Sequence, residues 1–483
     1  MTTKKIKYNT LIKGMKCPRC GRRYPFNIHK VLCTKCNCYL EVEYDYERIR
    51  KRTLQWKVRR RLGVWAYKEL LPYISNKAKI SLGEGGTPLI FSKRLIPGVR
   101  LMLKNETVNP TGSFLDRGST VVISLLNGMY KRVTCSVNAN LAVSLAAYCA
   151  KSDMQVTFFC SPDIDRGEFY QAIALGATIR IVHSQEEARK LAMKTGANAY
   201  YIDSANPFLL EGEKTTAFEI IEQLSWKPPD WIVVPVGTGG HLSMIWKAIK
   251  ELKKLRLIRG KLPRLIGVQT EAFSPLVDLF DGTYHRDYLG TIARDLVFLE
   301  PPKILEAYQA IKESRGVAIR VSDDELIASV KELASKEGIL VEPAAASTIA
   351  AIRKLYAEKM IEKGDSIVAI MTGSGLKNPD IIKSMIRSSK GSSLSDPKIA
   401  ILKAIKTLGG KGHGYVIKDI LREKFNIEIS LPTIYHHLKE LEQTGFLRRL
   451  HMVNRRRVYY ELTTKAERVL DSEIKSQSKY NRI

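Results

Sequence analysis

The feature that most constrains the fold is a regular alternation of short apolar runs with helical patterns between about residues 76 and 390. Representative runs occupy residues 156–159, 231–236 and 366–371, and most of their side chains are apolar. Strands of this kind are buried on both faces, as in parallel sheets covered by helices. We therefore predict a doubly wound α/β domain with parallel sheets, whose ligands bind beyond the carboxyl ends of the strands.

Size and composition place this domain within a longer globular chain. The 483 residues predict two or three domains, and a hydrophobic share of 45% is that of a folded protein. No run approaches the roughly 18 apolar residues of a membrane span. The lysine-rich N-terminus lacks the apolar core of a secretory signal. We therefore expect no membrane partner and a cytoplasmic location.

Basic residues are concentrated at the two ends of the chain, whose net charge is +29. Residues 1–75 hold 19 lysines and arginines against 5 acidic residues, and residues 395–483 hold 18 against 10. Such clusters either contact nucleic-acid phosphates or form a solvated surface, and two clusters with motif support favour nucleic acid. The basic run at residues 48–52 and 59–61 is either a solvated helix face or a phosphate-contacting arm.

Four cysteines near the N-terminus have the spacing of a metal site. Cys17 and Cys20 form one C-x2-C pair, and Cys33 and Cys36 form a second, with 12 residues between the pairs. Four thiolates complete a zinc tetrahedron and leave no position for water, so we predict a structural zinc rather than a catalytic one. A reducing compartment makes disulfides the weaker alternative. Cys38 either competes as a ligand or remains free.

One ten-residue segment carries a resemblance to a known family. Residues 109–118 read N-P-T-G-S-F-L-D-R-G, and they resemble the cofactor-lysine motif of the threonine synthases, N-P-T-G-S-F-K-D-R-G. Residues 81–88, S-L-G-E-G-G-T-P, are similar to the family's S-L-G-E-G-N-T-P, and residues 211–219, E-G-E-K-T-T-A-F-E, to its E-G-Q-K-T-I-A-F-E. Residues 372–377, T-G-S-G-L-K, resemble the family's T-G-H-G-L-K. Residues 342–347, E-P-A-A-A-S, also fit the family pattern.

The resemblance covers about residues 15–380 and includes the zinc ribbon that begins many archaeal-type threonine synthases. It implies a fold-type-II, tryptophan synthase beta-like fold and pyridoxal phosphate as the cofactor. We therefore divide this part of the chain into a zinc ribbon at residues 1–45, a basic connector at 46–75 and a threonine-synthase-like domain at 76–390. Proteins of this fold type usually dimerise, so the resemblance also implies a homodimer.

The resemblance assigns roles to residues of the predicted site. In the family, the residue matching Asn140 contacts the phenolic oxygen of the cofactor, and the threonine matching Thr372 faces its pyridine nitrogen. A glycine-rich loop between a strand and a helix would hold the cofactor phosphate on backbone N–H groups. That loop consists of Gly237, Thr238, Gly239 and Gly240.

Two departures from the family pattern affect the reaction. Leu115 stands where the family has the lysine that forms the Schiff base, and leucine has no amine for covalent chemistry or proton transfer. Residues 137–141 read V-N-A-N-L where the family has S-S-G-N-T, so the hydroxyl groups and the glycine that cradle the substrate carboxylate are lost. We therefore predict no catalytic residue and, at most, non-covalent binding of pyridoxal phosphate. Lys104 matches a different family lysine and is not expected to replace the missing one.

The C-terminal part of the chain lies outside this resemblance. Residues 391–397 read as a linker, residues 398–475 as a separate domain and residues 476–483 as a polar tail. Helical patterns at about 397–408, at 415–424 and from Ser430 onward precede a hairpin of residues 446–453 and 458–462. This order resembles the winged helix-turn-helix of bacterial and archaeal regulators, which implies double-stranded DNA as the partner.

The third helix of this domain has one apolar face, formed by Ile434, Leu438 and Leu441. Three arginines at the hairpin tip favour DNA over the alternative, a winged helix used for protein contacts. His436 and His437 are adjacent, and adjacent residues of a helix face apart. Groove contacts are therefore a better interpretation of this pair than a metal site. The predicted DNA-binding residues are Thr433, Tyr435, His436, His437 and Lys439 on the helix and Arg455, Arg456 and Arg457 on the wing.

Together these observations favour a DNA-binding transcriptional regulator whose degenerate threonine-synthase-like domain senses an amino acid or pyridoxal phosphate. A second interpretation is a working pyridoxal-phosphate-dependent threonine synthase or related lyase with an appended regulatory domain. A third is a dimerisation scaffold without a ligand, although a scaffold has no need of a phosphate loop.

Overall fold

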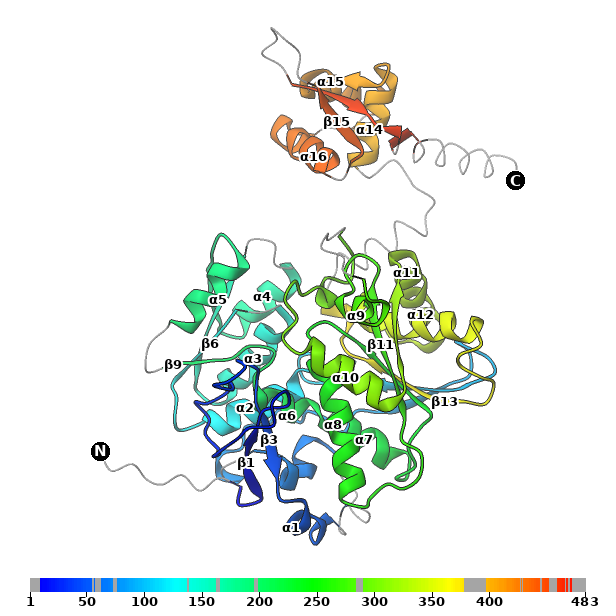
Figure 1. Ribbon diagram of the computed structural model, residues 1–483. Coiled ribbons are helices and arrows are strands. Elements are labelled where there is room, and N and C mark those ends of the chain that lie inside the picture. The colour runs from blue at the N-terminus through cyan, green and yellow to red at the C-terminus, as the bar shows by residue number, and fades with distance from the viewer. Residues whose placement is uncertain are drawn as a thin grey trace. The chain divides into compact units, whose positions relative to one another are not determined.

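The structure, a computed structural model, divides into two compact units, Met1–Ile381 and Ile382–Ile483. Each unit is described by itself (Figure 1). The described residues are 9–53, 56, 62–72, 76–136, 139–161, 166–194, 199–283, 290–377, 397–425, 427, 429–443, 445–450, 458–464, 466–467 and 470.

The first unit begins with a small antiparallel sheet in the order β2-β1-β3. Its strands are β1 (Ile12–Lys16), β2 (Arg23–Tyr24) and β3 (Glu41–Tyr44). Met15, Leu40, Val42 and Tyr44 are buried and form its core. The short helix α1 (Tyr46–Arg50) follows, capped by the Asp45 side chain. The basic residues 48–52 therefore fall on and just after this helix, and residues 59–61 lie outside the described part of the chain.

A six-stranded sheet forms one half of the remaining unit, in the order β12-β11-β10-β13-β5-β4. The pairs are parallel except that β4 runs antiparallel to β5. The strands are β4 (Leu89–Ser92), β5 (Arg100–Asn105), β10 (Trp231–Pro235), β11 (Arg264–Thr270), β12 (Val317–Val321) and β13 (Ser366–Met371). The apolar runs at 231–236 and 366–371 give β10 and β13, whose residues are almost all buried, as the pattern predicts.

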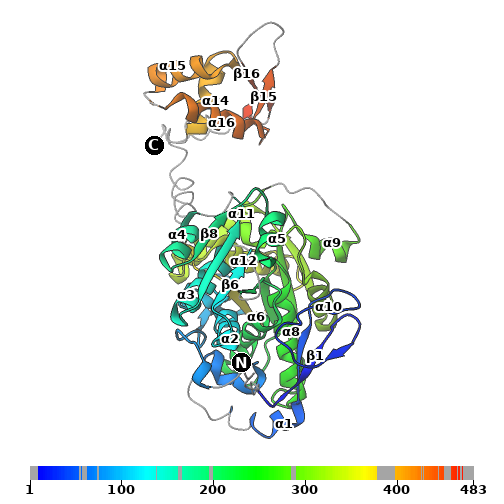
Figure 2. The same ribbon diagram turned by 90° about the vertical axis from the view of Figure 1, so that its left-hand side faces the viewer.

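Helices flank this sheet and connect its strands (Figures 1 and 2). They are α7 (Thr215–Gln223), α8 (Gly240–Lys254), α9 (Pro275–Asp281), α10 (Ile304–Ser314), α11 (Asp323–Glu332) and α12 (Pro343–Ala357). Shorter turns of helix are η2 (Val64–Leu70), η3 (Asn76–Ala78), η4 (Glu106–Val108), η5 (Arg294–Leu296), η6 (Leu333–Glu337) and η7 (Gly375–Lys377).

The other half is a four-stranded, fully parallel sheet in the order β8-β7-β6-β9. Its strands are β6 (Arg132–Cys135), β7 (Gln155–Cys160), β8 (Thr178–Ile181) and β9 (Ala199–Tyr201). The helices of this half are α2 (Asp116–Leu126), α3 (Ala139–Lys151), α4 (Arg166–Ala174), α5 (Gln185–Met193) and α6 (Pro207–Glu213). Two parallel sheets with helices on both sides are the doubly wound α/β architecture that the sequence predicts.

The second unit has the element order of a winged helix. Helices α14 (Pro397–Thr407), α15 (Gly414–Phe425) and α16 (Leu431–Gln443) precede the antiparallel strands β15 (Leu447–Leu450) and β16 (Tyr459–Leu462). A short strand β14 (Lys411–Gly412), which the sequence did not predict, pairs with β16. Ile434, Leu438 and Leu441 on α16 are buried in the core of this unit, as their spacing predicts.

Among the described residues, no helix is both long and apolar enough to span a bilayer.

Candidate functional site

A pocket in the first unit is lined by residues from the end of β10 and from segments that connect the strands and helices of both halves. It holds about 680 Å³ of space not filled by atoms, counting the part open to solvent. Its walls include the segment before α2, the start of α3 and the segments that follow β10 and β13. The pocket thus lies beyond the carboxyl ends of β10 and β13, where doubly wound sheets bind ligands.

Six of the residues predicted for the site line this pocket: Leu115, Asn140, Gly237, Thr238, Gly239 and Thr372. Gly240, the seventh, is the first residue of α8 and adjoins them. Leu115 is 7% exposed and directly precedes α2. Lys104 is fully buried and is not among the pocket-lining residues.

The loop after β10 is a close-fitting turn that requires glycine. Gly239 adopts a φ of 86°, which side chains disfavour. A Cβ on Gly239 would lie 2.5 Å from the carbonyl oxygen of Lys303, and one on Gly237 would lie 2.7 Å from that of Asp295. The loop leads into the N-terminus of α8, which carries fifteen residues and a positive end potential. Such a loop is suited to an anionic group.

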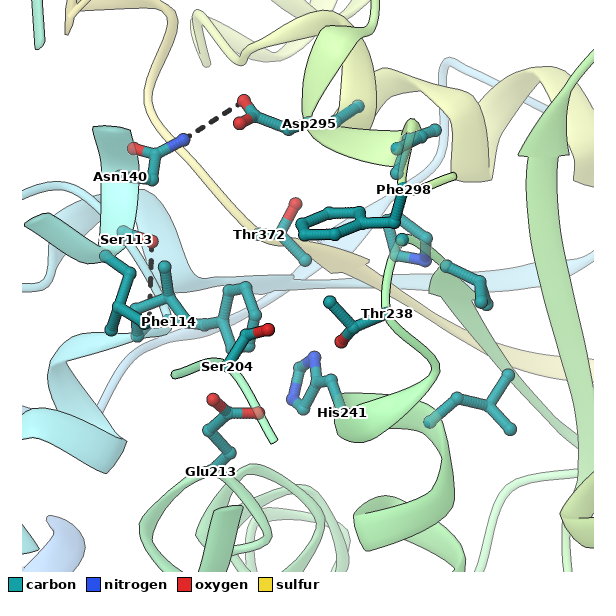
Figure 3. Close-up of a pocket in the computed structure, with 18 of the residues that line it drawn as sticks. Ser113, Phe114, Asn140, Ser204, Glu213, Thr238, His241, Asp295, Phe298 and Thr372 are labelled. Atoms are coloured by element: carbon teal, nitrogen blue, oxygen red, sulfur yellow. Dashed lines mark hydrogen bonds between the residues drawn. The ribbon is translucent and has the colours of Figure 1, made fainter. Parts of the chain in front are cut away.

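One end of the pocket carries carboxylates around Asn140 (Figure 3). The Asn140 amide donates to Asp295 Oδ2 at 3.0 Å and to Glu342 Oε2 at 3.4 Å. The buried Lys377 ammonium donates to Asn140 Oδ1 and lies 3.7 Å from Glu342 Oε2. Asp295, Glu342 and Glu168 bring carboxylate oxygens within 4.8 Å of one another. The sequence interpretation did not include these residues, although Glu342 and Lys377 lie within the quoted motifs.

The other end is formed by Ser204, Glu213 and His241, with Thr238, Phe298 and Thr372 between the ends (Figure 3). The His241 ring stacks on Phe114, with centroids 4.2 Å apart and planes at 15°. Its Nε2 lies 3.2 Å from Thr216 Oγ1, and its buried Nδ1 has no hydrogen-bond partner. Burial lowers the pKa of His241 to about 3, so the ring is neutral.

Glu213, the last residue of α6, is 2% exposed at this end of the pocket. Its carboxyl group makes no hydrogen bond or ion pair with another described residue. Burial raises the pKa of Glu213 well above its usual range, because water no longer solvates the charge. Burial therefore disfavours the charged form of both groups, and both residues line the pocket.

A separate polar cluster lies behind the pocket and is fully paired. Arg117 binds Glu106 at 2.6 Å and Glu219 at 2.7 Å, and Lys104 binds Glu219 at 2.8 Å. These four side chains are completely buried. Arg117 lies two residues after Leu115, so this cluster anchors the segment that carries Leu115.

The four cysteines predicted to bind metal come together. The sulfur atoms of Cys17, Cys20, Cys33 and Cys36 all lie within 4.8 Å of one another. Cys17 Sγ lies 3.3 Å from Cys36 Sγ, and Cys20 Sγ lies 3.6 Å from Cys33 Sγ. Cys38 Sγ instead contacts Glu306 Oε1 at 3.3 Å. Four soft thiol donors with no further ligand position fit a structural zinc ion.

The predicted DNA-binding residues of α16 differ in exposure. Thr433, His436 and Lys439 are exposed. His437 is 19% exposed and its Nδ1 lies 3.1 Å from Glu440 Oε2, while Tyr435 is half-buried against Gly414. Arg455, Arg456 and Arg457 lie outside the described residues, as do Val137 and Asn138 of the altered loop.

The fold and the pocket define the first unit as a member of the fold-type-II class of α/β proteins. The chain matches the family described as "Pyridoxal-phosphate dependent enzyme" over residues 80–373, and it belongs to that family. Residues 401–472 match "Transcriptional regulator PadR-like family". The chain thus joins a threonine-synthase-like unit to a PadR-like regulator domain, which implies DNA as a partner.

Curated relatives are similar over about three quarters of this chain. A threonine synthase of Methanocaldococcus jannaschii is 39% identical over 380 residues, which cover 76% of this chain and 93% of that protein. A threonine synthase of Methanosarcina acetivorans is 35% identical with the same coverage. Among solved structures, an L-serine ammonia-lyase of Rhizomucor miehei has a TM-score of 0.51 and 19% identity, covering 62% of this chain and 98% of its own. At that identity the structural likeness shows the fold alone.

Proposed function

We propose that this protein is a DNA-binding transcriptional regulator whose threonine-synthase-like unit binds a small molecule and does not catalyse the family's reaction. The observation that carries the proposal is the position of Leu115. It lies in the wall of the pocket, inside a motif that otherwise matches the family, in the same chain as a PadR-like domain. A leucine there removes the amine on which the reaction depends.

The pocket fits pyridoxal phosphate at one end and lacks its covalent anchor. Gly237 and Gly239 leave no room for side chains, so their backbone would hold a phosphate group at the N-terminus of α8. Asn140 and Thr372 would contact the ring, in the roles that the family resemblance implies. When bound, this cofactor supplies an electron sink for amino-acid chemistry. With Leu115 in the wall, Asn140, Thr372 and the glycine loop would bind and orient such a ligand without a covalent bond.

The ligand would act on DNA binding only if it favours one arrangement of the recognition helices over another. We propose a homodimer, since two copies of α16 and of the arginine-rich wing would match a near-palindromic site. Thr433, His436 and Lys439 are exposed on α16 and are assigned to the DNA surface, and Arg455, Arg456 and Arg457 are assigned to the wing. The zinc ribbon is assigned a structural role.

A salt titration tests the DNA-binding part of this proposal. Each phosphate contact releases counterions, so affinity for a specific fragment should fall steeply as salt rises. The measurement is the dissociation constant of the full chain for a genomic fragment between about 50 and 200 mM salt, where several phosphate contacts cost a hundredfold or more. A flat response would count against a DNA-binding regulator.

The second candidate is an active threonine synthase or related lyase with a regulatory domain. The 39% identity to the enzyme of Methanocaldococcus jannaschii favours it. It predicts phosphate release from O-phosphohomoserine by the wild-type chain, lost when pyridoxal phosphate is removed. Absence of such turnover, together with specific DNA binding, supports the regulator.

A further inference from the structure

The end of the pocket formed by Ser204, Glu213 and His241 is its floor (Figure 3). The family pattern does not explain the chemistry of this floor. Glu213 and His241 lie there together, 2% and 6% exposed. His241 Nδ1 has no partner, and the Glu213 carboxyl has none among the described residues. Buried polar groups are normally hydrogen-bonded, and two unpaired ones in one pocket indicate that a ligand completes them.

Glu213 also departs from the motif that surrounds it. Residues 211–219 match the threonine-synthase motif E-G-Q-K-T-I-A-F-E except at two positions, and Glu213 replaces its glutamine. Glutamine and a protonated glutamic acid have nearly the same shape, and each offers both a donor group and an acceptor oxygen to a ligand. An ionised glutamate would offer acceptors only and would repel an anion.

The position of the floor indicates which ligand group it meets. His241 is the second residue of α8, and the glycine loop immediately precedes that helix. A Cβ on Gly240 would lie 3.6 Å from the carbonyl oxygen of Ser204, so the floor adjoins the helix N-terminus. Backbone N–H groups and the helix potential favour an anion at this place. No lysine or arginine lines the pocket among the described residues, so no cation competes for that role.

We propose that Glu213 and His241 form a neutral hydrogen-bonding floor that receives the phosphate group of the ligand, with the proton of the Glu213 carboxyl in the contact. This inference rests on the proposed ligand-binding function. The ligand class is a phosphate monoester carried on a flat ring, and the unphosphorylated compound would leave the floor unpaired. Ionisation of Glu213 would place like charges together and weaken binding.

The surroundings of Glu213 leave it without a neutralising partner. The elements packed against α6 are β3, α2, α7 and α8. Their charged or titratable side chains are Glu41, Glu43, Tyr44, Asp116, Arg117, Glu219, Glu222, His241, Lys247, Lys250, Glu251, Lys253 and Lys254. Lys253 and Lys254 are exposed, and the others apart from His241 are paired elsewhere. Tyr44 and Lys247 bind Glu211, Arg117 binds Glu219, and Glu251 binds Lys214. Asp116 accepts from Thr111 and Ser144, Glu222 accepts from Tyr67, and Glu41, Glu43 and Lys250 pair with Lys303, Arg23 and Glu313. Burial is the cause that raises the pKa of Glu213.

The test measures binding of pyridoxal phosphate and of pyridoxal to the full chain by isothermal titration calorimetry. In Glu213→Leu, affinity for pyridoxal phosphate should fall about tenfold or more, since a hydrogen bond to a charged group is lost, and affinity for pyridoxal should not change. Glu213→Gln should retain binding, because the amide also donates. Glu186→Gln on α5, whose side chain is 77% exposed, is the matched control and should behave as wild type.

A pH series separates this role from a merely structural one. The ligand phosphate ionises alike with wild type and with Glu213→Gln. The dissociation constant of wild type divided by that of Glu213→Gln therefore reports the ionisation of Glu213 alone. This quotient should rise by up to about tenfold per pH unit once Glu213 ionises. Equal affinity of wild type for pyridoxal and pyridoxal phosphate, or an unchanged affinity of Glu213→Leu for the phosphate, would overturn the inference while leaving ligand binding intact. Binding of neither compound would overturn the inference and the ligand-sensing function together.

Discussion

The first unit contains two sets of buried polar side chains on neighbouring segments, and the two sets differ in whether their polar atoms have partners. Arg117, Glu106, Glu219 and Lys104 behind the pocket satisfy one another completely. Glu213 and His241, which lie in the pocket, leave polar atoms without partners. The paired cluster holds the scaffold in shape, whereas the open pair adds no internal bond and is suited to a ligand. The paired cluster thus lies within the scaffold, whereas two departures from the family motifs, Leu115 and Glu213, line the pocket.

The largest effect is expected from breaking the paired cluster. Arg117→Met would leave Glu106 and Glu219 buried with only Lys104 to neutralise them, and we expect a loss of about 3–5 kcal/mol in the free energy of unfolding. Urea denaturation of the full chain measures this. Lys190→Met on α5, whose side chain is 66% exposed, is the control and should change stability by less than about 0.5 kcal/mol. A loss below about 1 kcal/mol in Arg117→Met would show that the cluster does not hold the scaffold.

The next effect concerns the missing amine. Leu115→Lys should gain a yellow covalent adduct with pyridoxal phosphate that wild type lacks, because the pocket would regain its anchor. Borohydride reduction followed by peptide mass spectrometry locates the adduct. A restored lysine base would also raise any turnover by about a hundredfold or more. A yellow wild type with an adduct on another lysine would contradict the interpretation of Leu115.

A smaller effect is expected from the open pair, and it depends on pH. The folded-state pKa of Glu213 is raised by burial, so its stabilising contribution is complete below the unfolded-state pKa of about 4.3 and is lost as pH rises toward the folded-state pKa. Glutamine does not ionise, so Glu213→Gln removes this loss of folding stability. The variant should therefore become more stable than wild type as pH rises, by up to about 1.4 kcal/mol per unit. Parallel pH profiles of the unfolding free energy would show that Glu213 has a partner.

The smallest effect extends the comparison to the second unit, where α16 has a buried apolar face and an exposed polar face that carries Lys439. Lys439→Ala should weaken DNA binding about equally for all sequences and reduce the salt slope by about one. Its side chain is exposed, so folding should not change. Fluorescence anisotropy at several salt concentrations measures the slope, and an unchanged slope would remove Lys439 from the DNA surface.

Much of the fold follows from local patterns in the sequence. The apolar runs at 231–236 and 366–371 predict β10 and β13, because continuous burial is the signature of a parallel strand. The buried positions Ile434, Leu438 and Leu441 predict the inner face of α16. The four-cysteine cluster follows from the tight geometry of each C-x2-C pair.

The rest of the site depends on contacts between distant segments. Asp295 meets Asn140 across 155 positions of sequence, and no local pattern marks Asp295 as a pocket residue. The unpaired state of Glu213 and His241 is likewise invisible in sequence, because it is a property of everything that surrounds them. The half-buried position of Tyr435 against Gly414 also arises from packing between α15 and α16.

The measurement that tests the central claim most directly is sequencing of genomic fragments retained by the purified full chain at physiological salt. The account predicts a few enriched promoters that share a two-fold-symmetric motif, with enrichment reduced when Arg455, Arg456 and Arg457 are replaced by alanine. Uniform retention of all fragments, or no retention, would contradict a specific regulator and return attention to enzymatic chemistry in the pocket.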